Sequence, residues 1–75
     1  MNEFYKKLKY MFESVNEEDW KFGLILAEEK PWTNDIFELI QEHFLMFRNN
    51  DNNIIIFQRG KFNYQYERKI SSDNS

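Results

Sequence analysis

The stretch WKFGLILAEE, residues 20–29, decides the fold, because it fits either a strand or a helix. As a strand, its large side chains at positions 20, 22, 24 and 26 all point one way. As a helix, it has a good N-cap in Asn16, followed by three acidic residues at the positive end of the helix dipole. Its apolar side chains scatter around a helical wheel, however, so the alternation favours a strand over residues 20–26.

A helix is predicted on each side of this stretch. Between Phe4 and Val15, apolar residues recur at three- and four-residue spacing, which predicts an amphipathic helix from about residue 2 to about residue 16. Pro31 ends the ambiguous stretch, and Thr33 then caps a helix that we expect to reach about residue 49. The apolar residues of this second helix fill an arc of about 180°, wider than a surface helix needs.

The last third of the chain predicts a β-hairpin. The apolar run at residues 54–57 is typical of a strand covered on both faces, and residues 61–70 alternate between large and polar side chains. A turn is expected in the Asn-rich residues 49–53, and Arg59 and Gly60 are expected to form the hairpin turn. A lone hairpin is marginal in water, so a third strand at residues 20–26 would support it.

The predicted fold class is therefore α+β, in the order helix, strand, helix, strand, strand. It has a small three-stranded antiparallel sheet with the helices on one face. If residues 20–29 are helical, the fold becomes three helices plus a β-hairpin. At 75 residues, the chain has room for one domain, predicted over residues 1–70, with a disordered polar tail at residues 71–75.

Composition limits the chemistry that this chain can perform. It has no cysteine and one histidine, which fits a reducing cytoplasm and removes thiolate metal sites and cysteine nucleophiles. His43 lies on the apolar arc of its helix without a second His or a carboxylate on that face, so we interpret it as a core residue. We expect no enzyme activity, no metal and no cofactor. The lysine-containing residues 1–10 predict neither a signal peptide nor a membrane span.

A candidate binding surface lies on the hairpin. With a turn at Arg59 and Gly60, Ile54 faces Gln65 and Ile56 faces Asn63, which leaves two isoleucines among polar neighbours on the face away from the helices. Ile25 of the predicted first strand could extend this exposed apolar patch, and such patches mark contact surfaces. A three-residue turn would instead swap the faces and bury both isoleucines.

Charge suggests a second contact. The formal net charge is −3, with basic ends and an acidic middle. Asp35, Glu38 and Glu42 follow the polar side of the second helix, where they are either a solvated face or a surface that complements a basic partner. Nucleic acid is disfavoured as a partner by the negative charge, and a winged-helix-like DNA-binding regulator remains the alternative if residues 20–29 are helical.

The C-terminal third resembles the end of YezG-type toxin-immunity proteins. The resemblance spans residues 47–50, the run at residues 54–57, and the stretch GKFNYQY at residues 60–66. Those proteins end in a helix and a hairpin with a Gly-Lys-Phe turn, whereas this chain is shorter and carries Pro31 and Trp32 before its helix rather than after it. The resemblance implies a small acidic bacterial or phage protein that neutralises a protein partner by occluding it.

These patterns together predict a small cytoplasmic protein-binding inhibitor of the immunity, antitoxin or phage counter-defence kind. Its partner-binding residues are expected to be Ile54, Ile56, Ile25, Asp35, Glu38 and Glu42. The same patch could instead close a homodimer, which would help so short a chain to reach adequate stability.

Overall fold

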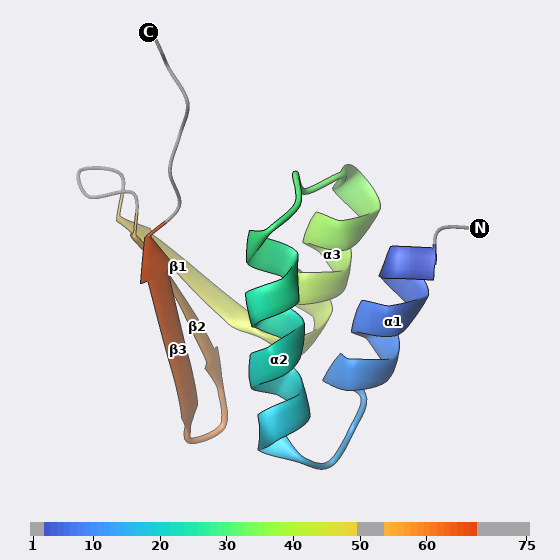
Figure 1. Cartoon of the computed structure of the whole chain (residues 1–75). Helices are drawn as coiled ribbons and strands as arrows, with labels where there is room; N and C mark the ends of the chain where they lie inside the picture. The colour runs from blue at the N-terminus through green and yellow to red at the C-terminus, as the bar shows by residue number, and fades with distance from the viewer. Residues whose placement is uncertain (1–2, 50–53, 68–75) are drawn as a thin grey trace, which may run out of the picture. The chain divides into compact units, whose positions relative to one another are not determined.

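The computed structural model describes residues 3–49 and 54–67, and it has the α+β class that the sequence predicts. Its elements follow the order helix, helix, helix, strand, strand, strand (Figure 1). The chain divides into a helical unit that ends at His43 and a sheet unit that begins at Phe44. The predicted tail at residues 71–75 and most of the predicted turn at residues 49–53 lie outside the described residues.

Three helices make up the helical unit: α1 (Glu3–Phe12), α2 (Glu17–Glu28) and α3 (Asn34–His43). The first helix ends four residues before the predicted boundary, and Val15, expected on its apolar face, is 98% exposed. Helix α3 begins directly after Thr33 as predicted, and the carbonyl oxygen of Thr33 accepts a hydrogen bond from the Phe37 N–H (2.9 Å). The buried side chains of this unit are Leu8, Phe12, Leu24, Ala27, Ile36, Leu39 and Ile40.

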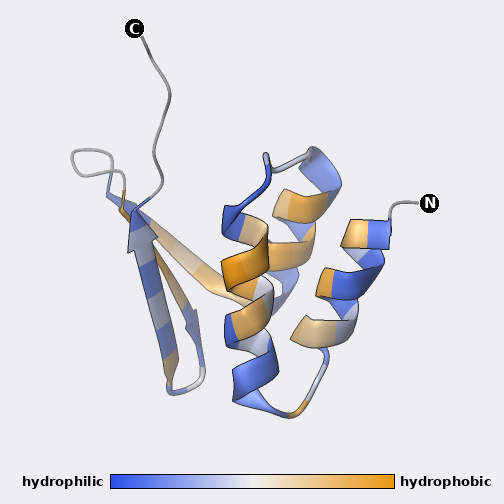
Figure 2. Ribbon diagram, in the orientation of Figure 1, coloured by the Kyte–Doolittle hydropathy of each residue, from blue (hydrophilic) through white to orange (hydrophobic). Residues whose placement is uncertain are grey.

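The predicted strand at residues 20–26 is wrong, because this stretch lies inside α2. The Asn16 side chain accepts a hydrogen bond from the Glu18 N–H (2.9 Å), so the N-cap that favoured the helix is real. The first turn of α2 is hydrophilic and its middle turns are hydrophobic (Figure 2). Its buried residues are Gly23, Leu24 and Ala27, two of which are too small to register as a hydrophobic stripe in the sequence.

Side-chain hydrogen bonds hold the two turns between the helices. The Trp20 indole N–H donates to the Ser14 carbonyl oxygen (2.7 Å), and the Ser14 hydroxyl donates to the Asp19 carboxylate (2.6 Å). At the other end of α2, the Trp32 indole N–H donates to the Ala27 carbonyl oxygen (2.9 Å), and the Trp32 ring lies 6.3 Å from that of Phe37. Each tryptophan therefore donates its indole N–H to a backbone carbonyl at or just beyond a helix end, and the Trp32 ring also packs against Phe37.

The sheet unit is a three-stranded antiparallel meander of β1 (Leu45–Asn49), β2 (Ile54–Arg59) and β3 (Phe62–Glu67), with β2 in the centre. The predicted strand number is confirmed, but the third strand comes from residues 45–49, which the sequence assigned to the second helix. That helix stops at His43. Pairing with β2 gives residues 45–49 a ladder of five residue pairs, and the hairpin gains the third strand that it needs.

The hairpin turn consists of Gly60 and Lys61 rather than the predicted Arg59 and Gly60. Gly60 has φ +62°, which a two-residue hairpin turn requires at its first position and which glycine adopts without steric cost. Ile56 consequently faces Gln65, and Ile54 faces Glu67. The register is shifted by two residues from the predicted one, so every side chain stays on its predicted face.

Gly23 allows α1 and α2 to approach closely, and we expect Gly23→Ala to destabilise the fold. A Cβ atom at position 23 would lie 2.6 Å from Cε1 of the Phe12 ring, which is fully buried and cannot move aside without disturbing its neighbours. Such overpacking costs roughly 1 to 3 kcal/mol, which exceeds the gain of about 1 kcal/mol that alanine offers over glycine in an exposed helix. Thermal and urea unfolding should therefore show a lower free energy of unfolding.

Lys21→Ala is the matched control, because Lys21 is an exposed residue of the same helix. Its effect should stay within about 0.5 kcal/mol. A Gly23→Ala variant as stable as the parent would show that α1 and α2 do not pack through this glycine.

Candidate functional site: the exposed sheet face

The pairing register assigns every strand residue to one of two sheet faces. One face carries Ile55 and Phe57 of β2, which are 1% and 0% exposed. We call the opposite face the exposed sheet face. The residue pairs that β2 forms with β1 and with β3 show which residues belong to it. It consists of Leu45, Phe47, Asn49, Ile54, Ile56, Gln58, Asn63, Gln65 and Glu67.

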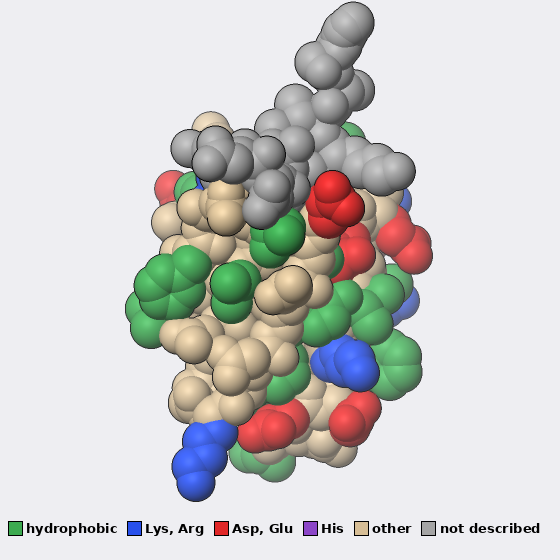
Figure 3. All heavy atoms as spheres, turned by 90° about the vertical axis from the view of Figure 1, so that its left-hand side faces the viewer, with side chains coloured by type: hydrophobic (Ala, Val, Ile, Leu, Met, Phe, Trp, Pro, Cys, Tyr) green, Lys and Arg blue, Asp and Glu red, His purple; other side chains and the backbone are tan. Residues whose placement is uncertain are grey.

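Four of these residues form an apolar patch: Leu45, Phe47, Ile54 and Ile56. Leu45 and Phe47 are 64% and 50% exposed, and the two isoleucines are half-buried. Phe47 lies directly opposite Ile56 in the ladder, so the patch is continuous across β1 and β2. Figure 3 shows hydrophobic side chains (green) at the surface on one side of the molecule, amid backbone and uncharged polar groups (tan).

The exposed sheet face is almost without charge. Among the strand residues that the structure describes, Glu67, at the end of β3, is the one charged residue of this face. The positions around the patch are amides: Asn49, Gln58, Asn63 and Gln65. Protein interfaces have this composition, with an uncharged apolar centre and polar groups at the rim that can form hydrogen bonds. The face is therefore suited to contact with another surface.

The structure places the predicted binding residues on two different units. Ile54 and Ile56 lie on the exposed sheet face, on the side opposite the buried Ile55 and Phe57, as the sequence predicts. Ile25 does not extend this face, because it is a half-buried residue of α2 rather than a strand residue. Leu45 and Phe47, the most exposed members of the patch, were missed because residues 45–49 were assigned to a helix.

The three acidic candidates Asp35, Glu38 and Glu42 are exposed and occur on α3 at i, i+3 and i+7, which is one side of the helix. The Asp35 carboxylate accepts a hydrogen bond from the Thr33 hydroxyl and another from the Ile36 N–H (2.9 Å). These bonds lower the pKa of Asp35, with the Thr33 hydroxyl as the main cause. Asp35 thus closes the first turn of α3 in addition to contributing charge.

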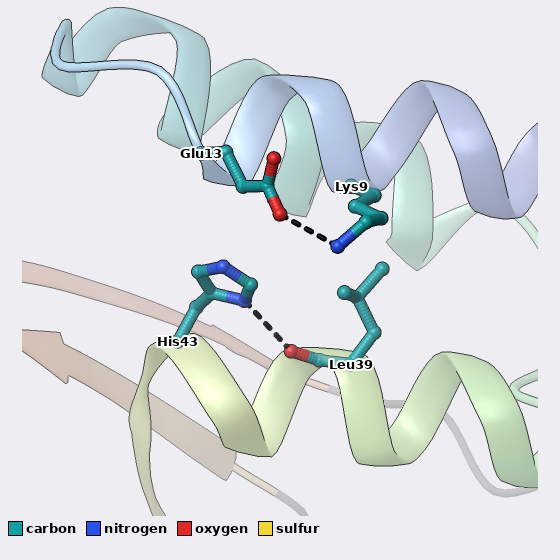
Figure 4. Close-up of polar contacts among 4 residues, drawn as sticks. All are labelled: Lys9, Glu13, Leu39 and His43. Carbon is teal, nitrogen blue, oxygen red and sulfur yellow. Dashed lines mark hydrogen bonds and ion pairs between the residues drawn. The ribbon is translucent and has the colours of Figure 1, made fainter.

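His43 is part of the helical packing. Its Nδ1 lies 3.1 Å from the Leu39 carbonyl oxygen, and its ring centroid lies 5.8 Å from that of Phe12. Figure 4 shows the imidazole near the ion pair between Lys9 and Glu13, whose nitrogen and oxygen atoms are 2.6 Å apart. The hydrogen bond of this exposed pair raises the pKa of Lys9 and lowers the pKa of Glu13. In the described ranges, no three His, Cys, Asp or Glu side chains gather to hold a metal ion.

Comparison with known proteins gives no relative: no family model, curated protein or solved structure matches this chain. None of the helices in residues 3–49 combines the length and apolarity that a bilayer crossing requires.

The link between Asp35 and Thr33 predicts a specific titration. Because the Thr33 hydroxyl is the largest cause of the lowered pKa of Asp35, Thr33→Val should raise that pKa toward the ordinary aspartate value. A folded-state pKa below the unfolded value stabilises the fold at neutral pH, and this stabilisation is lost as the pH falls from about 4 through the lowered pKa. The Thr33→Val variant should therefore lose less stability than the parent in that acid range.

Carboxyl-detected NMR titration measures the Asp35 pKa directly, and thermal unfolding from neutral to acid pH measures the stability. An Asp35 pKa equal in both proteins would contradict the assigned cause.

Proposed function

We propose that this chain is a small cytoplasmic protein-binding inhibitor of the immunity, antitoxin or phage counter-defence kind. It acts by laying the exposed sheet face over a functional surface of another protein and occluding it. The observation that carries the proposal is the apolar patch at Leu45, Phe47, Ile54 and Ile56, set in a face with a single charge. The resemblance of the hairpin to that of YezG-type immunity proteins supports the same class.

Association would remove from water the surface that the fold leaves exposed. Burying the remaining exposed surface of Leu45 and Phe47 would contribute about 1 to 2 kcal/mol for each side chain. The half-buried isoleucines add less, but they complete a continuous apolar centre from which water is excluded. Recognition through such a face depends on shape and on amide hydrogen bonds, because the face offers little charge.

The acidic side of α3 would affect the rate of association with the partner. Asp35, Glu38 and Glu42 give the helical unit a negative surface that attracts a basic partner and speeds the encounter. Such exposed charges affect the association rate and its salt dependence more than the final affinity. A partner that carries both a basic region and an apolar region would satisfy both surfaces.

The alternative function is that of a winged-helix-like DNA-binding regulator. Because α2 is a helix, three helices precede the hairpin, as this alternative requires. In that class, a helix presents its exposed side to the major groove. The exposed side of α3 carries three carboxylates, which repel phosphates. Protein binding therefore explains the two surfaces better than DNA binding does.

The double variant Phe47→Thr and Ile56→Thr tests the proposal. These residues are opposite each other at the centre of the patch, and threonine keeps a high strand propensity while removing most of the apolar surface. Affinity capture from the native host, with parent and variant as paired baits, should give a protein that only the parent retains. The purified captured protein should lose activity when the parent is added, and the variant should bind it at least about tenfold more weakly.

Arg48→Thr is the matched control, because it introduces threonine at an exposed position of β1 that pairs with Ile55 and so lies on the opposite face. This control should retain the captured protein, and both variants should show the circular dichroism of the parent. Equal retention by the parent and the double variant would rule out the apolar patch as the binding site.

A further inference from the structure

The outer edge of β3 offers backbone hydrogen-bonding groups in a defined pattern. Arg59 and Phe62 flank a two-residue turn, and such a pair exchanges both of its backbone hydrogen bonds. Pairs along an antiparallel ladder then alternate, so Asn63, Gln65 and Glu67 turn their N–H and C=O groups away from β2. Since β3 is at one end of the strand order, these groups point away from the other two strands, and no strand among the described residues pairs with them.

This edge lacks the features by which proteins normally prevent edge strands from pairing. Between Phe62 and Tyr66, it has no charge, no proline and no break in the register with β2, and its aromatic residues favour extended structure. The side chains of Asn63, Gln65 and Glu67 are exposed. An added strand is therefore chemically favoured here.

The sequence of the edge is complementary to itself. When two β3 strands run antiparallel with Tyr64 on the two-fold axis, Asn63 faces Gln65 and Phe62 faces Tyr66. In the same alignment, Lys61, the turn residue directly before β3, comes opposite Glu67 of the other copy, so each of the two charged residues in 61–67 lies near an opposite charge. If the two-fold axis passes through residue 63 or 65 instead, Lys61 no longer lies opposite Glu67. Of these three registers, only the one centred on Tyr64 therefore pairs the two charges.

We propose that two copies of this chain pair through their β3 edges in this register and form a continuous six-stranded sheet. The second copy is the fitting occupant because each position from Lys61 to Glu67 meets a suitable partner in an identical strand. This inference goes beyond the proposed function and does not depend on it. The pairing uses the edge of the sheet and leaves the apolar patch uncovered.

A charge-swap series tests the pairing. Sedimentation velocity between about 5 and about 500 µM should show a concentration-dependent dimer of the full chain. Lys61→Glu and Glu67→Lys should each weaken dimerisation by about tenfold, because each places two like-charged pairs in the dimer. The double variant should restore the parental dissociation constant.

Restoration would be diagnostic, because Lys61 in the turn and Glu67 at the far end of β3 are about 20 Å apart in one copy and hardly interact there. Lys7→Glu is the matched control, since it makes the same change in net charge at an exposed position of α1 and should leave dimerisation nearly unchanged. A chain that stays monomeric throughout this range, or a double variant that dimerises no better than the single ones, would overturn the proposal.

Cysteine pairing tests the register independently, because the chain has no cysteine of its own. In the proposed dimer, positions 63 and 65 of different copies face each other about 5.5 Å apart at Cα, within the range of a disulfide. Mixing Asn63→Cys with Gln65→Cys under mild oxidation should give a cross-linked heterodimer, while each variant alone should cross-link slowly. Equal rates for the mixture and the single variants would exclude this register.

Discussion

The alternation of side chains along the central strand β2 is the constraint on which the sheet and its surface depend. Phe57 packs its ring against Tyr64 and Tyr66, at centroid distances of 6.5 and 5.5 Å, and against Phe44 at 6.1 Å. Because successive strand residues point to opposite faces, burying Ile55 and Phe57 on one face puts Ile54 and Ile56 on the other. The apolar patch is thus a consequence of a strand that is hydrophobic on both faces in a sheet with one exposed face.

The helical unit shows why the sequence favoured the wrong secondary structure for α2. Its inward stripe consists of the half-buried Trp20 and the buried Gly23, Leu24 and Ala27, at i, i+3, i+4 and i+7. This is the spacing of an amphipathic helix, but glycine and alanine do not count as large apolar residues when a pattern is scored. Phe22, which strengthened the alternating pattern, is 57% exposed. The N-cap at Asn16 was the correct local signal, and close packing at Gly23 explains why the helix face is made of small residues.

The opposite error concerns residues 44–49, which the sequence assigned to a helix, whereas residues 45–49 form the strand β1. The predicted helix had an apolar arc of about 180°, and Phe44, Met46 and Phe47 contributed to it although they lie beyond the end of α3. An arc that wide was itself a sign that two elements had been merged. What ends the helix is a tertiary effect, the ladder between β1 and β2, which no local propensity encodes.

The sequence predicted half of the apolar patch, namely the face on which Ile54 and Ile56 lie. The predicted turn was displaced by one residue, yet the resulting shift of two in the register preserved the faces, so Ile54 and Ile56 were placed on the correct side. Their neighbours Leu45 and Phe47 could not be identified from the sequence, because doing so required knowing that residues 45–49 form a strand.

Edge pairing through β3 would also fix how the two apolar patches of a dimer lie relative to each other. A two-fold axis perpendicular to the sheet keeps the exposed sheet faces of both copies on one side, with the two patches centred about 20 Å apart across the strands. A partner that is itself two-fold symmetric could then engage both patches at once, and the second contact would form at a high effective concentration.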